Sequence, residues 1–269
     1  MEFYTLEKLE FKSNWLDCVD ATYILYLEGS SRYNKLKEQI TLNPPSKIVY
    51  IVHNPGYKKV NKPLQKQNSE EDIKFSHIII CEFALKENYK NILVLEDDFI
   101  LDTELITPEI NKNVSLFLEN NNVDHYYLGC TPFISVPASF NLLNWKVLYG
   151  GTTHAMIHTT SGMKKLITAY KNKKILLGID LFIFTNNYCF MYYKPLITQL
   201  FTDTENKIRC WGSGSFVSNI ASTFVNLLNL DKKDQPGFNY IYFFSKISLI
   251  IIITIVVLII YAVYNFFKK

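Results

Sequence analysis

The stretch "NILVLEDD", residues 91–98, joins a continuous apolar run to three consecutive acids. A short apolar run of this kind is typical of a strand that other elements cover on both faces. The acids Glu96, Asp97 and Asp98 repel one another and resist desolvation. The stretch therefore predicts a buried strand that ends either in a solvated loop or at a site where a cation binds.

Segments on both sides of this strand alternate between strand-like and helix-like patterns. Strands are expected at 21–29, 47–53, 122–129, 144–150, 153–158 and 188–196, and helices at 30–40, 69–87, 159–171 and 214–230, with one more helix starting near Thr107. This alternation indicates an α/β fold with a mostly parallel central sheet, which we assign to one domain at 1–230. Residues 54–68 combine turn formers and lysines without periodicity, so we expect a loop there.

The segment "ISLIIIITIVVLIIYAVYNFF", residues 247–267, contains no charged side chain. As a helix it would be about 31 Å long, enough to cross the hydrocarbon core of a bilayer. Aromatic residues near both of its ends suit the two membrane interfaces. We expect a transmembrane tail anchor at 247–267, preceded by a linker and juxtamembrane segment at 231–246. The alternative is a buried core helix.

Other features of the sequence bear on the compartment and the partners. The first residues carry acids and no apolar stretch of signal-peptide type, so we expect no secretory signal and a catalytic domain on the cytosolic side. Lysines flank both ends of the apolar segment, which makes the charge signal for orientation weak. The five cysteines, scattered without metal-ligand spacing, fit a reducing compartment. A net charge of +3 gives no argument for nucleic-acid binding.

The position of the three acids suggests a chemistry. Ligands of such sheets bind beyond the carboxyl ends of the strands. Carboxylate oxygens suit Mg²⁺ or Mn²⁺, and a bound diphosphate would complete the coordination shell. A nucleotide-sugar donor needs such an ion because its departing diphosphate accumulates negative charge. The alternatives are a solvated turn or a cap for the next helix.

Five motifs occur in an order that resembles family 25 glycosyltransferases, the group of lipopolysaccharide-type and collagen-type sugar transferases. They are "YILYLEGSSR" ending at Arg32, "SEEDIKFSH" with Glu70, Ser76 and His77, "ILVLEDD", "THAMIHTTSGMKKLI", and "GID" ending at Asp180 with "KPLITQ" after it. The resemblance extends from about Tyr23 to Gln199. It implies a GT-A-type nucleotide-sugar-binding fold and transfer of a hexose, galactose or glucose, from a UDP-sugar with inversion.

The resemblance also implies roles for individual residues. Asp98 would be a metal ligand, with Glu96 as a second acid directed at the metal or the ribose. Asp97 would turn away and hold the loop, although it also lies within the donor-binding segment. Arg32 would face the diphosphate, where a fixed cation is useful; its alternative is an exposed arginine at a helix start. Asp180 is the candidate general base for the acceptor hydroxyl, with a helix N-cap as its alternative role.

The histidines form no spacing typical of a metal site. His77 is expected to be a hydrogen-bonded core residue in the middle of a buried helix. His154 is similar, with a better chance of facing the substrate because it begins a strand near the site. We assign no ligand role to His53, His125 or His158.

Together these features predict a membrane-anchored, Mn²⁺- or Mg²⁺-dependent sugar transferase acting on a hydroxyl of a protein, glycan or glycolipid. The bias towards Lys, Asn, Ile, Tyr and Phe is expected of an A/T-rich genome, and a large DNA virus, with the protein in a host membrane or virion, is the suggested source. The alternative function is an inactive, membrane-anchored binding protein of the same fold. A metal-dependent phosphohydrolase would need ligands from further positions, and a glycosidase would need a second catalytic carboxylate.

Overall fold

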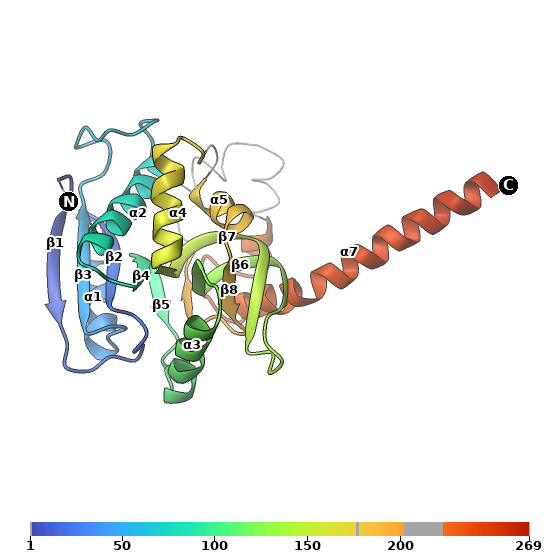
Figure 1. The fold of residues 1–269 in the computed structure, drawn as a ribbon, viewed down its shortest axis with the longest axis horizontal. Coiled ribbons are helices and arrows are strands. Elements are labelled where there is room, and N and C mark those ends of the chain that lie inside the picture. Colours follow the sequence, from blue (N-terminus) through green and yellow to red (C-terminus); the bar gives the residue numbers. More distant parts are fainter. Residues whose placement is uncertain (1, 176–177, 202–222, 269) are drawn as a thin grey trace.

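The computed structural model describes residues 2–175, 178–201 and 223–268. Its centre is a seven-stranded mixed sheet, from which a long C-terminal helix projects (Figure 1). The strands are β1 (Thr5–Glu10), β2 (Ala21–Leu27), β3 (Ile48–Asn54), β4 (Asn91–Glu96), β6 (His125–Pro137), β7 (Asn144–Thr159) and β8 (Cys189–Tyr192). A separate two-stranded sheet joins β5 (Phe99–Leu101) to β9 (Ile197–Gln199).

The strand order of the large sheet is β1-β3-β2-β4-β7-β6-β8. Strands β3, β2 and β4 are parallel neighbours, while β7 runs antiparallel to both β4 and β6. Since β8 is parallel to β6, and β1 antiparallel to β3, only β1 and β7 oppose the common direction. The prediction of a mixed α/β fold with a mostly parallel central sheet is therefore confirmed.

Helices follow several of these strands along the chain. They are α1 (Tyr33–Leu42), α2 (Ser69–Lys86), α3 (Pro108–Asn120), α4 (Thr160–Lys171), α5 (Ile179–Asn186) and α7 (Gly237–Lys268), with a short 3-10 turn at Thr103–Leu105. Side chains cap several of them: Asn68 accepts from the backbone N–H of Glu71, and Thr107 accepts from that of Ile110. These contacts satisfy backbone donors that a first helical turn leaves without partners.

Side chains of the central strands point alternately into two cores. On β2, Tyr23 and Leu25 belong to one core, and Ile24 and Tyr26 to the other. The first core also holds buried side chains of α2, α4, α5 and the start of α7, and the second those of α1 and α3. Because both faces are covered, the central strands are continuously apolar, as the run in β4 predicted.

Several elements differ from the sequence-based expectation. Strand β1 was not expected; it pairs only with β3, at the edge of the sheet. The two strands expected at 144–150 and 153–158 form one strand, β7, which makes a long irregular hairpin with β6. The helix expected at 214–230 lies partly outside the described residues, which resume at 223.

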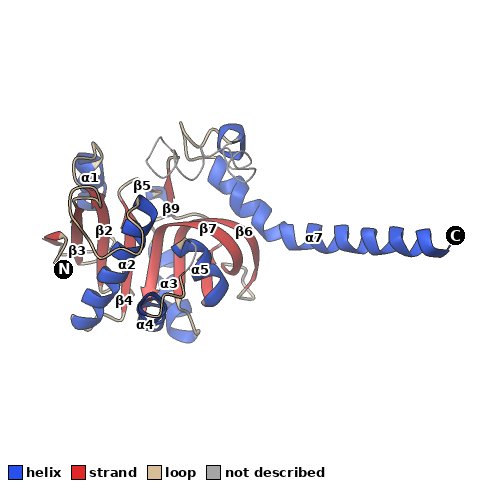
Figure 2. Cartoon of the chain, turned by 90° about the horizontal axis from the view of Figure 1, so that it is seen from above, coloured by secondary structure: helices blue, strands red, loops and turns tan. Residues whose placement is uncertain are grey.

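Helix α7 starts within the segment expected to be a linker. Its first turns pack beside β6, where Phe238, Ile241 and Tyr242 are buried (Figure 2). From Ile250 onwards the apolar side chains whose burial the structure describes are exposed. The stretch Gly237–Tyr261 is, among the described residues, the one helix long and apolar enough to cross a membrane.

Candidate functional site

The three acids lie at the carboxyl edge of the sheet. Glu96 is the last residue of β4, and Asp97 and Asp98 form the turn that leads to β5. The neighbouring strand β2 ends at the same edge, because Leu25 is paired in register with Glu96. Arg32, directly before α1, follows β2. The parallel pairing of β2 and β4 thus brings together residues about 65 positions apart in sequence.

Arg32 contacts two of these acids. Its Nη1 atom lies 2.7 Å from Oδ1 of Asp97 and 3.7 Å from Oδ2 of Asp98. Burial by itself lowers the pKa of Arg32. The hydrogen bond to Asp97 and the neighbouring negative charges outweigh this effect, so the pKa of Arg32 is raised above its ordinary value. The second oxygen of Asp97 accepts a hydrogen bond of 3.4 Å from the backbone N–H of Leu27. Asp97 therefore connects the ends of β2 and β4 and fixes the position of the arginine.

The pKa values of Glu96 and Asp98 are raised even though Arg32 lies nearby. Burial raises the pKa of Asp98 to about 6, with Arg32 opposing and Asp97 adding to the shift. The Oδ1 atom of Asp98 is buried and has no hydrogen-bond partner among the described residues. Burial also raises the pKa of Glu96, and the charges of Asp98, Asp180 and Asp97 raise it further. A cation added here would relieve this repulsion.

Asp180 approaches the same place from α5. The N-cap of α5 is Gly178, and Asp180 is the second residue of the helix, so the alternative role as N-cap is wrong. Its Oδ1 atom accepts a hydrogen bond of 2.9 Å from the hydroxyl of Thr153 on β7. Burial raises the pKa of Asp180 above its ordinary value. The hydrogen bonds from Thr153 and from the backbone of Thr152 partly oppose this rise, and the charge of Glu70 adds to it. A carboxylate with a raised pKa is a suitable proton acceptor.

We call Arg32, Glu96, Asp97, Asp98 and Asp180 the carboxylate site. Two further residues belong beside it. Thr153 orients Asp180, and no sequence signal marks a threonine for such a role. Glu70 was recognised in a motif without a role; a side chain added at Gly178 would come 3.2 Å from its carboxylate.

A divalent ion fits the carboxylate site only in part. The described residues contain no group of three or more His, Cys, Asp or Glu side chains arranged to hold a metal ion. Glu96 and Asp98 nevertheless offer two hard carboxylates, and one oxygen of Asp98 has no other partner. Mg²⁺ is commonly held by one or two carboxylates together with substrate phosphates. The residues therefore suit an ion shared with a bound diphosphate better than a resident metal.

Among the described residues, no hydrogen bond joins a histidine to these acids. His125 and His158 are buried, with their Nδ1 atoms 3.0 Å apart, and the His77 ring lies 5.8 Å from that of His158. His77 is buried as predicted, but neither of its ring nitrogens has a hydrogen-bond partner among the described residues, so the expectation of a satisfied side chain is wrong. His154 is also buried, with Nδ1 3.2 Å from the hydroxyl of Thr152 and Nε2 3.3 Å from a backbone carbonyl.

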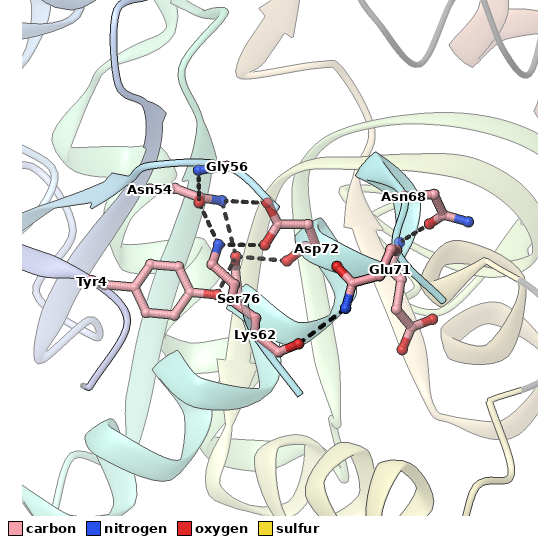
Figure 3. A network of polar contacts seen from close by, with 9 residues as sticks. Tyr4, Asn54, Gly56, Lys62, Asn68, Glu71, Asp72 and Ser76 are labelled. Carbon is pink, nitrogen blue, oxygen red and sulfur yellow. Dashed lines mark hydrogen bonds and ion pairs between the residues drawn. The ribbon is translucent and has the colours of Figure 1, made fainter. Parts of the chain in front are cut away.

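A buried polar network lies at the end of β3, the strand that pairs with β2 (Figure 3). The Lys62 ammonium donates to the Oδ1 atoms of Asn54 and Asp72 at 2.6 and 2.5 Å. Its side chain is fully buried, beside the ring of Tyr4. The loop predicted at 54–68, whose first residue belongs to β3, is thus attached to α2 by a buried ion pair. No local sequence pattern predicts that this lysine is buried.

Comparison with known proteins gives limited similarity. No protein-family model matches the chain, nor does any curated protein sequence. The crystal structure of a glycosyltransferase involved in the glycosylation of the major capsid of PBCV-1 covers 58% of this chain and 67% of its own, with 11% identity and a TM-score of 0.34. The crystal structure of A197 from STIV covers 70% and 87%, with 12% identity and a TM-score of 0.40. Similarity at this level is too weak to support a functional conclusion, which depends on the geometry of the carboxylate site.

Proposed function

We propose that the chain is a divalent-ion-dependent glycosyltransferase that moves a hexose from a UDP-sugar to a hydroxyl group. The observation that supports this is the meeting of Glu96, Asp98 and Asp180 at the carboxyl edge of the sheet, with Arg32 as the cation beside them. The order of motifs supports a relationship to family 25 glycosyltransferases as part of the same proposal. An ion held at Glu96 and Asp98 would neutralise the charge that develops on the departing diphosphate.

In this proposal each residue of the site has a separate task. Asp180 takes the proton of the acceptor hydroxyl while that oxygen attacks the anomeric carbon and the bond to the diphosphate breaks. Thr153 holds the Asp180 carboxylate in one orientation through its 2.9 Å hydrogen bond. Arg32, which Asp97 fixes at 2.7 Å, supplies positive charge at the same edge. Attack on the face opposite the leaving group gives inversion.

Helix α7 supports a second part of the proposal. Its apolar, exposed portion would span a membrane once, and the domain would lie on the cytosolic side, close to glycoprotein or glycolipid acceptors. An origin in a large DNA virus belongs to the proposal as well, on the basis of the amino-acid composition alone.

The decisive experiment measures UDP-sugar hydrolysis and transfer by the full chain in detergent, with and without Mn²⁺. Asp98→Asn keeps the size of the side chain and should reduce turnover about 10²- to 10³-fold, the usual effect of removing one electrostatic contact to the transition state. Glu104→Gln is the matched control, because Glu104 is exposed on the adjacent turn. Full turnover by Asp98→Asn would refute the proposed role of Asp98.

The same experiment addresses the alternative of an inactive binding protein. Such a protein would bind a UDP-sugar with Mn²⁺ without breaking the anomeric bond. Binding measured by calorimetry, together with the absence of released UDP for every sugar tested, would favour that alternative. Absence of both binding and hydrolysis would remove the nucleotide-sugar proposal altogether.

A further inference from the structure

Helix α7 is fastened to the domain just before its exposed portion begins. The hydroxyl of Ser245 lies 3.0 Å from that of Ser135 on β6. One residue later, the ammonium of Lys246 donates to the backbone carbonyl of Tyr193 at 2.6 Å. Ile250, one turn further on, is 65% exposed. The point where the helix leaves the protein is therefore defined to within about one turn.

Aromatic and basic side chains gather at this point. The Lys246 ammonium lies 5.2 Å from the ring centre of Trp145 and 5.5 Å from that of Tyr193. The ammonium of Lys194 lies 5.2 Å from the Tyr193 ring, so the two lysines share one aromatic neighbour. We call Trp145, Tyr193, Lys194 and Lys246 the exit cluster. It combines residues from the start of β7, the turn after β8 and α7.

No described carboxylate forms an ion pair with the lysines of the exit cluster. Among the ion pairs of the described residues, none joins Lys194 or Lys246 to a carboxylate. The cation–π contacts stabilise each ammonium but do not neutralise it. Two neighbouring positive charges that no described carboxylate pairs with favour an external anion. Tryptophan, tyrosine and lysine are also the residues that proteins place at the level of lipid headgroups.

We propose that the exit cluster binds the headgroups of anionic phospholipids in the leaflet where α7 enters the membrane. Charge complementarity supports lipid as the occupant, and so does the position of the cluster beside the first exposed turn of an apolar helix. The cluster would hold the domain at one height on the membrane, because Lys246 belongs to α7 and donates a hydrogen bond to the Tyr193 carbonyl of the domain. This inference rests on the membrane anchor of the proposed function and is independent of sugar transfer.

The test uses the full chain inserted into vesicles of phosphatidylcholine alone or with about one third phosphatidylserine. A membrane-impermeant reagent acetylates accessible lysines, and mass spectrometry gives the rate at each position. Acetylation of Lys194 should be about five-fold slower in the anionic vesicles, the effect expected for one basic residue at a charged surface. Lys35, exposed on α1, is the internal control and should react equally in both. High salt should remove the protection of Lys194.

A pair of variants distinguishes lipid binding at the exit cluster from a general attraction of basic side chains to the anionic surface. Lys246→Gln should reduce the protection of Lys194, whereas Lys12→Gln, with the same loss of charge on an exposed lysine, should leave it unchanged. Equal acetylation of wild-type Lys194 in both kinds of vesicle would overturn the inference. Release of the chain by alkaline washing would overturn it too, through loss of the anchor. Sugar transfer assayed in the same vesicles reports separately on the enzyme.

Discussion

At the scale of single residues, Asp98 is where the proposed function and the stability of the fold conflict. Its carboxylate is ordinarily half-protonated near pH 3.8, but burial raises its pKa to about 6. A buried acid with a raised pKa weakens the fold as the pH rises from the unfolded pKa to the folded pKa, because the unfolded chain releases a proton that the folded chain still holds. Proteins retain such groups at functional sites, where the charge is needed.

Asp98→Asn should therefore raise the free energy of unfolding at pH 7, by up to about 3 kcal/mol for a shift of this size. The gain should shrink as the pH falls from about 6 to 4, where the acid of the wild type is protonated as well. Urea denaturation at both pH values measures it, with Glu104→Gln as the control. A loss of stability at pH 7 would contradict the assigned cause.

The buried histidines weaken the fold at low pH, whereas Asp98 weakens it at high pH. Burial lowers the pKa of His77 from 6.5 to about 4 and that of His125 to about 3, and it also lowers the pKa of His158. Between pH 6.5 and 4 the unfolded chain therefore binds protons that the folded chain does not. Stability is complete above about pH 6.5 and falls as the pH decreases through this range.

His77→Leu should remove part of this acid sensitivity. His77 alone accounts for about 3 kcal/mol between pH 7 and 4 at the stated pKa shift. Leucine also removes two ring nitrogens that lack hydrogen-bond partners, so stability at pH 7 should not fall. Thermal unfolding followed from pH 7 to 4 tests this, with the partly exposed His53→Leu as control. If His77→Leu lost as much stability between pH 7 and 4 as the wild type, His77 would not be a source of the acid sensitivity.

At the scale of elements, the segment 55–68 depends on one ion pair. Lys62→Met leaves the Asp72 carboxylate buried without its cation, which should cost about 3–5 kcal/mol. Lys62→Met combined with Asp72→Asn should recover most of the loss, because the amide can still bond to Asn54 and carries no charge. Hydrogen exchange of residues 55–68 and chemical denaturation measure both effects, and the exposed Lys66→Met is the control. Equal losses in the single and double variants would show that the ion pair is not the cause.

The elements also show what the sequence could predict. The apolar run of β4 and the acids after it predicted both the strand and the edge of the sheet where the site lies, because both signals are local. Asp180 and Arg32 could be placed near that edge only through a resemblance, since their approach depends on the pairing of β2 with β4 and the packing of α5 on β7. The burial of Lys62 could not be predicted, because a lysine in a polar loop is normally solvated.

At the scale of the whole molecule, residues packed against the sheet continue past 230 into the segment expected to be a linker. A linker at 231–246 was expected because its first residues are polar. Phe238, Ile241 and Tyr242 are instead buried beside β6, and this burial depends on a partner surface that no local pattern reveals.

Truncation tests this boundary. A chain ending at Lys246 should keep its cooperative unfolding transition and lose its attachment to membranes. A chain ending at Asp231 should be less stable by several kcal/mol, since each fully buried apolar side chain contributes about 2 kcal/mol. Thermal unfolding of the two fragments in the same buffer makes the comparison. Equal melting temperatures would show that the first turns of α7 contribute nothing to the fold.

The unbroken course of α7 has a mechanical consequence. A helix with no hinge between its packed turns and its exposed apolar turns, which we propose to lie in a membrane, transmits rotation as a rigid lever. Apolar segments adjust to thinner or thicker bilayers by tilting. Any such tilt would rock the sheet against the headgroups and change the height of its carboxyl edge, so bilayer thickness would set how far an acceptor must extend to be reached.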